Sequence, residues 1–233
     1  DYEDYFEMIE TYDCLCGGFI WEWCDHAIYK GKAANGKGIY YYGGDHGEYP
    51  NDGNFCMDGM VYPDRTPHTG LLEYKNVHRP VRVVSYNQTE GIVLLKNEMN
   101  YLSLQEYVDV TYEVTCDGAL VESGQLDLTD VPAIRPHQIG NVQLPVNVPE
   151  KGTVYLKLTY QLKHADAFRS QGYELGFDEI LLENVDGSNR RVTDWLNSNI
   201  ENAEAIEVEE TERQLIVKGA RFCYTYDKLH GIL

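Results

Sequence analysis

Apolar residues near the start of the chain follow two different patterns. Residues 1–13 place aromatic and aliphatic side chains near a 3.6-residue period among acids, which predicts an amphipathic helix. Residues 14–24 form a nearly continuous apolar run, which is typical of a strand buried on both faces. A helix followed by such a strand indicates an α/β unit.

Regular periodicity disappears between residues 26 and 69. Gly, Asn, Asp, Tyr and Pro dominate this segment, and connections of this length without regular structure tend to be functional. Residues 70–77 then predict a short helix, which ends before Pro80.

After residue 80 the apolar positions alternate with a period of two. About seven short strands, separated by turn signals, predict an immunoglobulin-like β-sandwich. The expected strands are 81–86, 91–97, 108–116, 119–126, 138–146, 152–162 and 174–183. A polar linker follows, and further strands are expected at 206–210, 214–218 and 221–226. Three strands make little independent core, so we expect the chain to be cut inside a domain at both ends.

The charge balance narrows the set of partners. The chain has 38 Asp and Glu against 19 Lys and Arg, a formal net charge of −19. Such a surface repels phosphate backbones and anionic lipid heads, so we expect neither nucleic acid nor a membrane as a partner. A neutral ligand such as a sugar is compatible with this charge.

Six cysteines lie at positions without a CxxC pair or a regular framework. Several of them lie inside apolar runs, which indicates reduced, buried thiols in a cytoplasmic protein. No apolar stretch of about 20 residues is present, so the sequence predicts no membrane span.

Aromatic and acidic residues concentrate around the apolar run and the segment that follows it. Trp21 comes where the expected strand ends, and in α/β barrels the active site is built from such strand ends and the loops after them. Aromatic rings stack on the apolar face of a pyranose, while carboxylates and amides satisfy its hydroxyls. These residue types are compatible with a sugar site. From composition alone, however, Trp21 is more often a residue of the barrel core.

Four sequence blocks carry a specific resemblance. They are GGFIWEW at 17–23, YGGDHG at 42–47, NFCMDG at 54–59 and PDRTPH at 63–68. In this order and spacing they resemble the large beta-galactosidases of glycoside hydrolase family 2. The resemblance is strong over about residues 1–80 and extends more weakly through the later strands.

The resemblance implies a mixed fold of several domains. Residues 1–80 would be the C-terminal part of a (β/α)8 TIM barrel, and residues 81–186 the immunoglobulin-like β-sandwich. Residues 187–202 would be a linker, and residues 203–233 the first strands of a further, truncated β-sandwich domain. The parent protein would hydrolyse terminal, non-reducing β-D-galactosides such as lactose with retention.

Three residues acquire expected roles from the same resemblance. Trp21 matches the tryptophan that floors the galactose subsite. Phe55 matches a mobile-loop phenylalanine whose backbone carbonyl binds sodium. Asp58 stands where the best-known members have Asn, which contacts both that ion and the sugar. The carboxylate keeps an oxygen ligand but adds charge, which leaves the identity of the ion open. Magnesium would be bound in the parent enzyme by residues outside this chain.

The catalytic residues are expected elsewhere. Retaining glycosidases need two carboxyl groups about 5 Å apart, and the resemblance places both glutamates upstream of position 1. We therefore expect no catalytic residue in this chain, and no activity from this fragment alone. Its expected partners are the rest of the same polypeptide, a galactoside and further copies of the parent enzyme in a homo-oligomer.

Other interpretations remain open. Aromatic residues and a sandwich also suit a noncatalytic carbohydrate-binding module or a purely structural assembly domain. Within the enzymes, a beta-glucuronidase or mannosidase of the same family is an alternative, although the FCMDG and PDRTPH blocks favour a galactosidase.

Several single residues have simpler expected roles. Asp45, His46 and Glu48 resemble a metal cluster but fit turn chemistry better. Asp64 and Arg65 would form an ion pair or clamp within their loop, and His68 would need a positioned partner to act in catalysis. Glu22 is expected to be a structural acid and Trp23 a packing residue.

Overall fold

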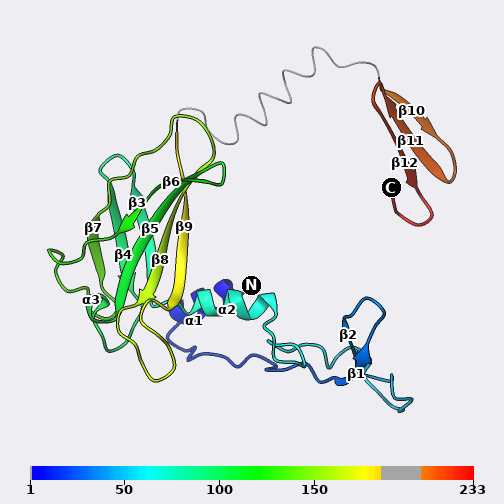
Figure 1. Cartoon of the computed structure of the whole chain (residues 1–233), viewed down its shortest axis with the longest axis horizontal. Helices are drawn as coiled ribbons and strands as arrows, with labels where there is room; N and C mark the ends of the chain where they lie inside the picture. The colour runs from blue at the N-terminus through cyan, green and yellow to red at the C-terminus, as the bar shows by residue number, and fades with distance from the viewer. Residues whose placement is uncertain (1, 185–205) are drawn as a thin grey trace. The chain divides into compact units, whose positions relative to one another are not determined.

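The computed structural model describes residues 2–184 and 206–233, which form two compact units. The first unit comprises Asp1–Val148 with Val154–Leu182, and the second comprises Pro149–Thr153 with Glu183–Leu233. Figure 1 shows a β-sandwich with two helices at one end in the first unit, and a small sheet in the second. The expected linker at 187–202 lies outside the described residues.

The sandwich consists of two antiparallel sheets. One has the strand order β3-β4-β7, formed by Val81–Asn87, Ile92–Asn97 and Ile139–Gln143. The other has the order β6-β5-β8-β9, formed by Ala119–Gln125, Val108–Cys116, Val154–Leu162 and Glu174–Leu182. All seven strands predicted from the period-two pattern are confirmed, with small differences at their ends.

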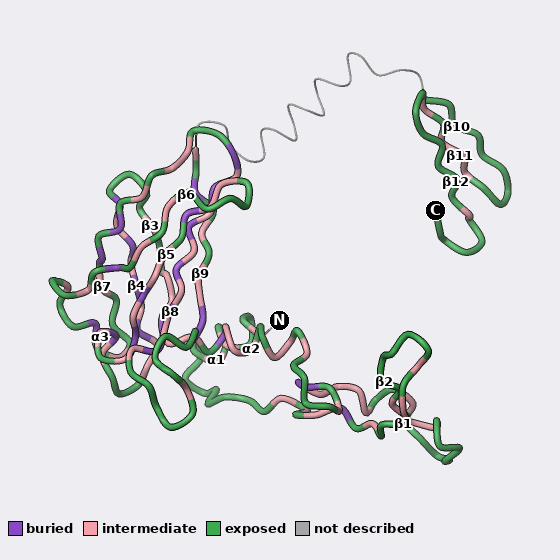
Figure 2. The backbone as a smooth tube through the Cα atoms, in the orientation of Figure 1, coloured by how far each residue is buried: buried purple, intermediate pink, exposed green. Residues whose placement is uncertain are grey.

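Alternation along the strands places one side of each sheet in the core. Strand β8 is the clearest case, because every second residue from Val154 to Leu162 is buried and the residues between them are only partly buried. The buried residues in Figure 2 accordingly gather between the two sheets. Burying each large aliphatic side chain contributes roughly 1.5–3 kcal/mol, so this shared core is the main source of stability in the unit.

A short helix, α3 (Leu104–Tyr107), precedes β5 and was not predicted. It begins with a capping box in which Ser103 and Glu106 bond each other's backbone and side chains. The Ser103 side chain holds the pKa of Glu106 below its ordinary value. A helix of 4 residues is too short to show a period, but the S-x-x-E spacing marked it.

Two longer helices pack against each other beside the sandwich. Helix α1 (Tyr2–Thr11) and helix α2 (Thr69–Val77) confirm the two predicted helices. The rings of Phe6 and His78 lie 4.5 Å apart edge to face, and those of Tyr2 and Tyr74 lie 5.6 Å apart. Burial among these residues lowers the pKa of His78 and favours its neutral form.

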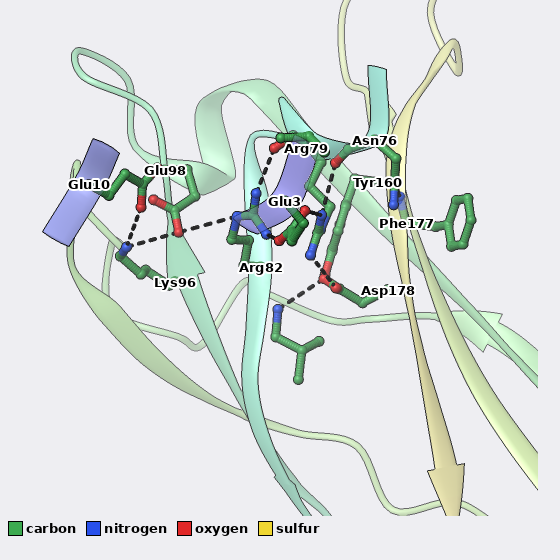
Figure 3. Close-up of polar contacts among 12 residues, drawn as sticks. Glu3, Glu10, Asn76, Arg79, Arg82, Lys96, Glu98, Tyr160, Phe177 and Asp178 are labelled. Atoms are coloured by element: carbon green, nitrogen blue, oxygen red, sulfur yellow. Dashed lines mark hydrogen bonds and ion pairs between the residues drawn. The ribbon is translucent and has the colours of Figure 1, made fainter. Parts of the chain in front are cut away.

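A polar network joins these helices to the sandwich (Figure 3). The Arg79 guanidinium pairs with Asp178 of β9 at 2.9 Å, and the other Asp178 oxygen accepts hydrogen bonds from Tyr160 at 2.5 Å and Val83 N–H at 2.9 Å. Glu3 of α1 contacts both Arg79 and Arg82. The network fixes how α1 and α2 lie on the end of the sandwich.

The prediction of a strand at residues 14–24 is wrong. Within the described residues this segment forms no strand, and only Cys24 makes an isolated bridge, with Val61. The side chains of Phe19, Trp21 and Trp23 are exposed. A strand buried on both faces requires paired neighbours along its length and elements covering each face. Within the described residues only residues 22–24 pair, with residues 58–61, and the aromatic side chains of the run stay exposed. The expected helix–strand unit is therefore not formed by this segment.

The loop expected between residues 26 and 69 also contains regular structure. Strands β1 (Ile28–Lys32) and β2 (Gly38–Tyr41) form a hairpin in which Tyr29 and Tyr40 are cross-strand partners. The turn contains Asn35 and Gly36, and the Asn35 side chain accepts a hydrogen bond from Lys37 N–H. This Asn-Gly pair is a recognised turn signal.

The second unit contains a three-stranded antiparallel sheet with the order β10-β11-β12. Its strands are Glu207–Glu210, Gln214–Gly219 and Phe222–Asp227, which confirms the three strands predicted there. In residues 2–184 and 206–233, no helix has the length and apolar character needed to cross a membrane.

Candidate functional site

The expected sugar-site residues lie where two distant segments run side by side. Glu22 N–H donates to the Asp58 carbonyl at 3.2 Å, and Met60 N–H donates to the Glu22 carbonyl at 2.9 Å. One step further, Val61 N–H donates to the Trp23 carbonyl at 3.0 Å. The fold therefore places Asp58 directly against the residue that follows Trp21.

Trp21 presents its ring to the surface. It is 78% exposed and lines an apolar cavity of 390 Å³ together with Phe19 and Tyr5, Phe6 and Tyr74 of the two helices. A partly walled aromatic surface of this kind can accept the apolar face of a sugar ring.

Phe55 lies in the same loop as Asp58 and is 73% exposed. Its N–H donates to the Asp52 carbonyl at 3.2 Å, and Met57 N–H donates to the Asn54 carbonyl at 3.0 Å, so the residues around it form consecutive turns. The described contacts do not bring the Phe55 ring against Trp21.

The Asp58 carboxylate has one buried oxygen without a hydrogen-bond donor among the described residues. Its Oδ1 atom is inaccessible to solvent and has no hydrogen-bond partner among the described residues. A covered carboxylate oxygen without a donor is costly unless a cation or ligand binds it. Asp58 therefore fits the expected cation ligand, although the part of the chain that the structure describes holds no cluster of three or more His, Cys, Asp or Glu suited to a metal.

Asp25 is a buried acid of this site that the sequence did not single out. Its side chain is fully buried, with Oδ1 accepting Gly59 N–H at 2.8 Å and Oδ2 lying 2.7 Å from His68 Nε2. His68 thus has the positioned partner that the sequence could not reveal. The two contacts link residues 34 and 43 positions apart, so no local pattern announces them.

Gly59 has a steric reason to be glycine. A Cβ atom at this position would lie 2.2 Å from the backbone nitrogen of Asp25 and 2.8 Å from Cα of Cys24. Both atoms belong to the backbone and cannot move aside. Any larger residue would therefore separate the two segments that carry Trp21 and Asp58.

The remaining loop acids organise turns. Glu48 accepts hydrogen bonds from Gly44 N–H and His46 N–H, and Asp45 accepts one from Tyr42 N–H. The bond from Gly44 is the largest cause that keeps the pKa of Glu48 below its ordinary value. The predicted turn chemistry is therefore observed for Asp45 and Glu48.

Asp64 and Arg65 stabilise their loop without pairing with each other. Asp64 accepts hydrogen bonds from the N–H and hydroxyl of Thr66, and the Thr66 hydroxyl is the largest cause that lowers the pKa of Asp64. Arg65 contacts Cys24 Sγ and donates to the Pro63 carbonyl. The loop-clamp interpretation is therefore confirmed in preference to the ion pair.

Two adjacent parts of the chain match models of known families. Residues 1–83 match the model described as glycosyl hydrolases family 2, TIM barrel domain. Residues 93–183 match the model described as beta-galactosidase, domain 4. The first match ends inside β3 and the second begins inside β4, so the change from one family model to the other falls within the first strands of the sandwich.

Individual relatives agree with both family matches. A beta-galactosidase from Actinobacillus pleuropneumoniae is 37% identical over 234 residues, covering 100% of this chain and 21% of the relative. One from Staphylococcus xylosus is 38% identical over 187 residues, covering 78% of this chain and 18% of the relative. One from Klebsiella pneumoniae is 48% identical over 132 residues, covering 57% and 13%. The chain spans about a fifth of the length of the curated relatives that it matches.

Proposed function

Because this chain belongs to glycosyl hydrolase family 2, with the large beta-galactosidases as its relatives, we propose that it is part of a retaining beta-galactosidase. The proposed substrates are terminal, non-reducing β-D-galactosides such as lactose. The single observation that carries the proposal is the pairing of Glu22 with Asp58, which places the exposed Trp21 and the unsatisfied Asp58 carboxylate on neighbouring backbone.

In this proposal Trp21 is the platform for the galactose ring. Its exposed indole offers a flat apolar surface, and the Asp58 carboxylate on the adjacent backbone is the proposed acceptor for a sugar hydroxyl. A ring stacked on an aromatic platform is restricted in orientation, which reduces the entropy that must be lost in reaching the reactive geometry.

Asp58, with the Phe55 carbonyl, is the proposed cation site. Hard cations bind through oxygen ligands, and the covered Asp58 oxygen supplies one. A bound sodium ion would compensate the carboxylate charge and offer a coordination position to a sugar hydroxyl. A carboxylate carries a negative charge that an amide lacks, so a site with Asp58 should bind a cation more tightly than the same site with Asn. The same charge also suits divalent cations. Magnesium is proposed only for parts of the parent protein beyond this chain.

The catalytic glutamates are proposed to lie in sequence that precedes position 1. Three acids of this part of the chain are already engaged: Asp25 with Gly59 and His68, Glu48 with loop amides, and Glu22 with His26 at 3.2 Å. We accordingly propose that this chain contributes a wall of the active site, that it is inactive alone, and that the parent enzyme is a cytoplasmic homo-oligomer.

A comparison of the isolated chain with the full-length protein tests this proposal. Hydrolysis of a nitrophenyl β-galactoside is expected from the full-length protein and not from residues 1–233 alone. Turnover by the isolated chain would contradict the placement of the glutamates. A full-length protein that binds galactosides without turnover would favour the noncatalytic binding module, and preferential hydrolysis of a β-glucuronide would favour the related enzyme class.

A further inference from the structure

The buried carboxylate of Asp25 holds three separate segments together. Its own N–H donates to the Val61 carbonyl at 3.0 Å, its Oδ1 accepts Gly59 N–H, and its Oδ2 contacts His68. His68 is further tied to the same region because its N–H donates to the Met60 carbonyl at 3.0 Å.

This arrangement satisfies a group that is otherwise costly to bury. Asp25 is only 2% exposed, and an isolated buried carboxylate carries a penalty of several kcal/mol. An amide and an imidazole nitrogen occupy its two oxygens, one on each side. Such a group stabilises one local arrangement and penalises others, because moving either partner leaves the charge unpaired.

The His68 ring is itself held in place. It stacks on the Tyr62 ring with a centroid separation of 3.7 Å and an interplanar angle of 25°. Tyr62 N–H donates to the Thr66 carbonyl at 2.9 Å, which closes the turn just before His68. The imidazole therefore provides Asp25 with a fixed partner.

The contacts of Asp25 also determine the position of Asp58. Its carbonyl is fixed by Glu22 N–H, and the next residue, Gly59, is fixed by the Asp25 side chain. The Asp58 carboxylate has no donor on Oδ1 among the described residues, so backbone contacts on either side determine where that oxygen lies. Loss of Asp25 would release one of these two contacts and leave Asp58 poorly placed.

We propose that Asp25, with His68, is a positioning residue that holds the backbone of residues 58–60 and thereby places the Asp58 carboxylate for cation and galactoside binding. The backbone part of this inference stands on the contacts above, whereas its consequence for binding rests on the proposed function. Because Asp25 is proposed to act through the backbone of residues 58–60, its effect is expected on binding of substrate and ion more than on the chemical step.

Hydrogen–deuterium exchange on the 233-residue chain tests the backbone part. In Asp25→Ala, amides of residues 56–61 are expected to exchange at least tenfold faster, while amides of β8 stay unchanged. Asp25→Asn should recover most of the protection, because its carbonyl oxygen still accepts from Gly59 and its amide still reaches His68. Asp64→Ala is the control, since Asp64 bonds only within its own turn. Unchanged exchange at 56–61 in Asp25→Ala would overturn the proposal.

Kinetics of the full-length protein test the consequence for binding. Asp25→Ala is expected to raise KM for a nitrophenyl galactoside and the sodium concentration for half-maximal activity about tenfold each, with a smaller change in kcat. Asp25→Asn should restore both values to within about threefold. A fall in kcat alone, or no rescue by Asn, would overturn the positioning role.

The two tests separate the possible failures. If the full-length protein does not hydrolyse galactosides, the proposed function fails while the exchange result still decides the backbone role. If Asp25→Ala loosens β8 as well, His68→Gln replaces it, because that variant keeps the Gly59 contact. Faster exchange confined to 56–61 in His68→Gln supports the proposal, and unchanged exchange there overturns it.

Discussion

At the scale of single residues, the site depends on contacts that no local pattern could predict. Trp21, Phe55 and Asp58 were identified by resemblance, and the structure shows that Asp58 lies against the residue after Trp21. Asp25 was only one of several acids in the sequence, because its partners Gly59 and His68 are distant along the chain. Contacts between residues far apart in the sequence are visible in the structure, but the spacing of residues along the chain does not reveal them.

Replacing Asp58 by Asn tests the role of its charge. Asn keeps the oxygen ligand but removes the negative charge, so the cation should bind less tightly. In the full-length protein, we expect Asp58→Asn to raise the half-saturating sodium concentration about tenfold, which corresponds to 1.4 kcal/mol. Asp64→Asn, a charge change in a neighbouring turn, should leave it unchanged. An Asp58→Asn protein with tighter sodium binding would contradict the proposed ligand.

At the scale of elements, the period-two pattern predicted all seven sandwich strands, and it is clearest in β4 and β8, where buried and partly buried positions alternate. The same reasoning was wrong for residues 14–24, where the described structure has no strand and only residues 22–24 pair with another segment. An apolar composition indicates that the side chains of a segment favour burial, but it does not show which element buries them. The β1–β2 hairpin was missed although its Asn35-Gly36 turn signal was present.

The core of the sandwich should be sensitive to cavities. Leu156 of β8 is fully buried among the strands of both sheets. Leu156→Ala is expected to lower the free energy of unfolding by about 2–5 kcal/mol, measured by urea denaturation. Leu181, on the same sheet, is half exposed, and Leu181→Ala should cost much less. Equal losses for the two variants would contradict the observed facing of the strands.

Tyr160 links the helices to the sandwich and predicts a pH effect. Burial is the largest cause that raises its pKa far above 10, and the nearby Asp178 charge adds to this. Above pH 10 the unfolded chain therefore loses a proton that the folded chain retains, so stability falls as pH rises, by about 1.4 kcal/mol per pH unit for each such group. Burial likewise raises the pKa of Tyr86 and Tyr112.

Tyr160→Phe isolates this contribution. The variant should be less stable at pH 7, because Asp178 loses a hydrogen bond, but its stability should fall less steeply above pH 10. Denaturant titrations between pH 8 and pH 11 give both values. Parallel pH profiles for the variant and the original protein would show that Tyr160 ionises equally in the folded and unfolded chains.

At the scale of the whole molecule, the chain combines a segment that matches a family 2 barrel domain with a sandwich that matches domain 4 of beta-galactosidase. The polar network around Arg79 and Asp178 fixes α1 and α2 on the sandwich. The apolar run at 14–24, with exposed Phe19 and Trp23, is compatible with a surface that further parts of a larger enzyme would cover. In this view the chain supplies a platform and an ion ligand, and the proposed glutamates act from elsewhere.

The most direct test is the effect of Trp21→Ala on kcat/KM for galactoside hydrolysis by the full-length protein. If Trp21 is the sugar platform, kcat/KM should fall about 100-fold, equivalent to roughly 2.7 kcal/mol of transition-state stabilisation. Phe168→Ala, which removes an exposed aromatic ring from a loop of the sandwich, should leave kcat/KM unchanged. An unchanged kcat/KM in Trp21→Ala would contradict the account.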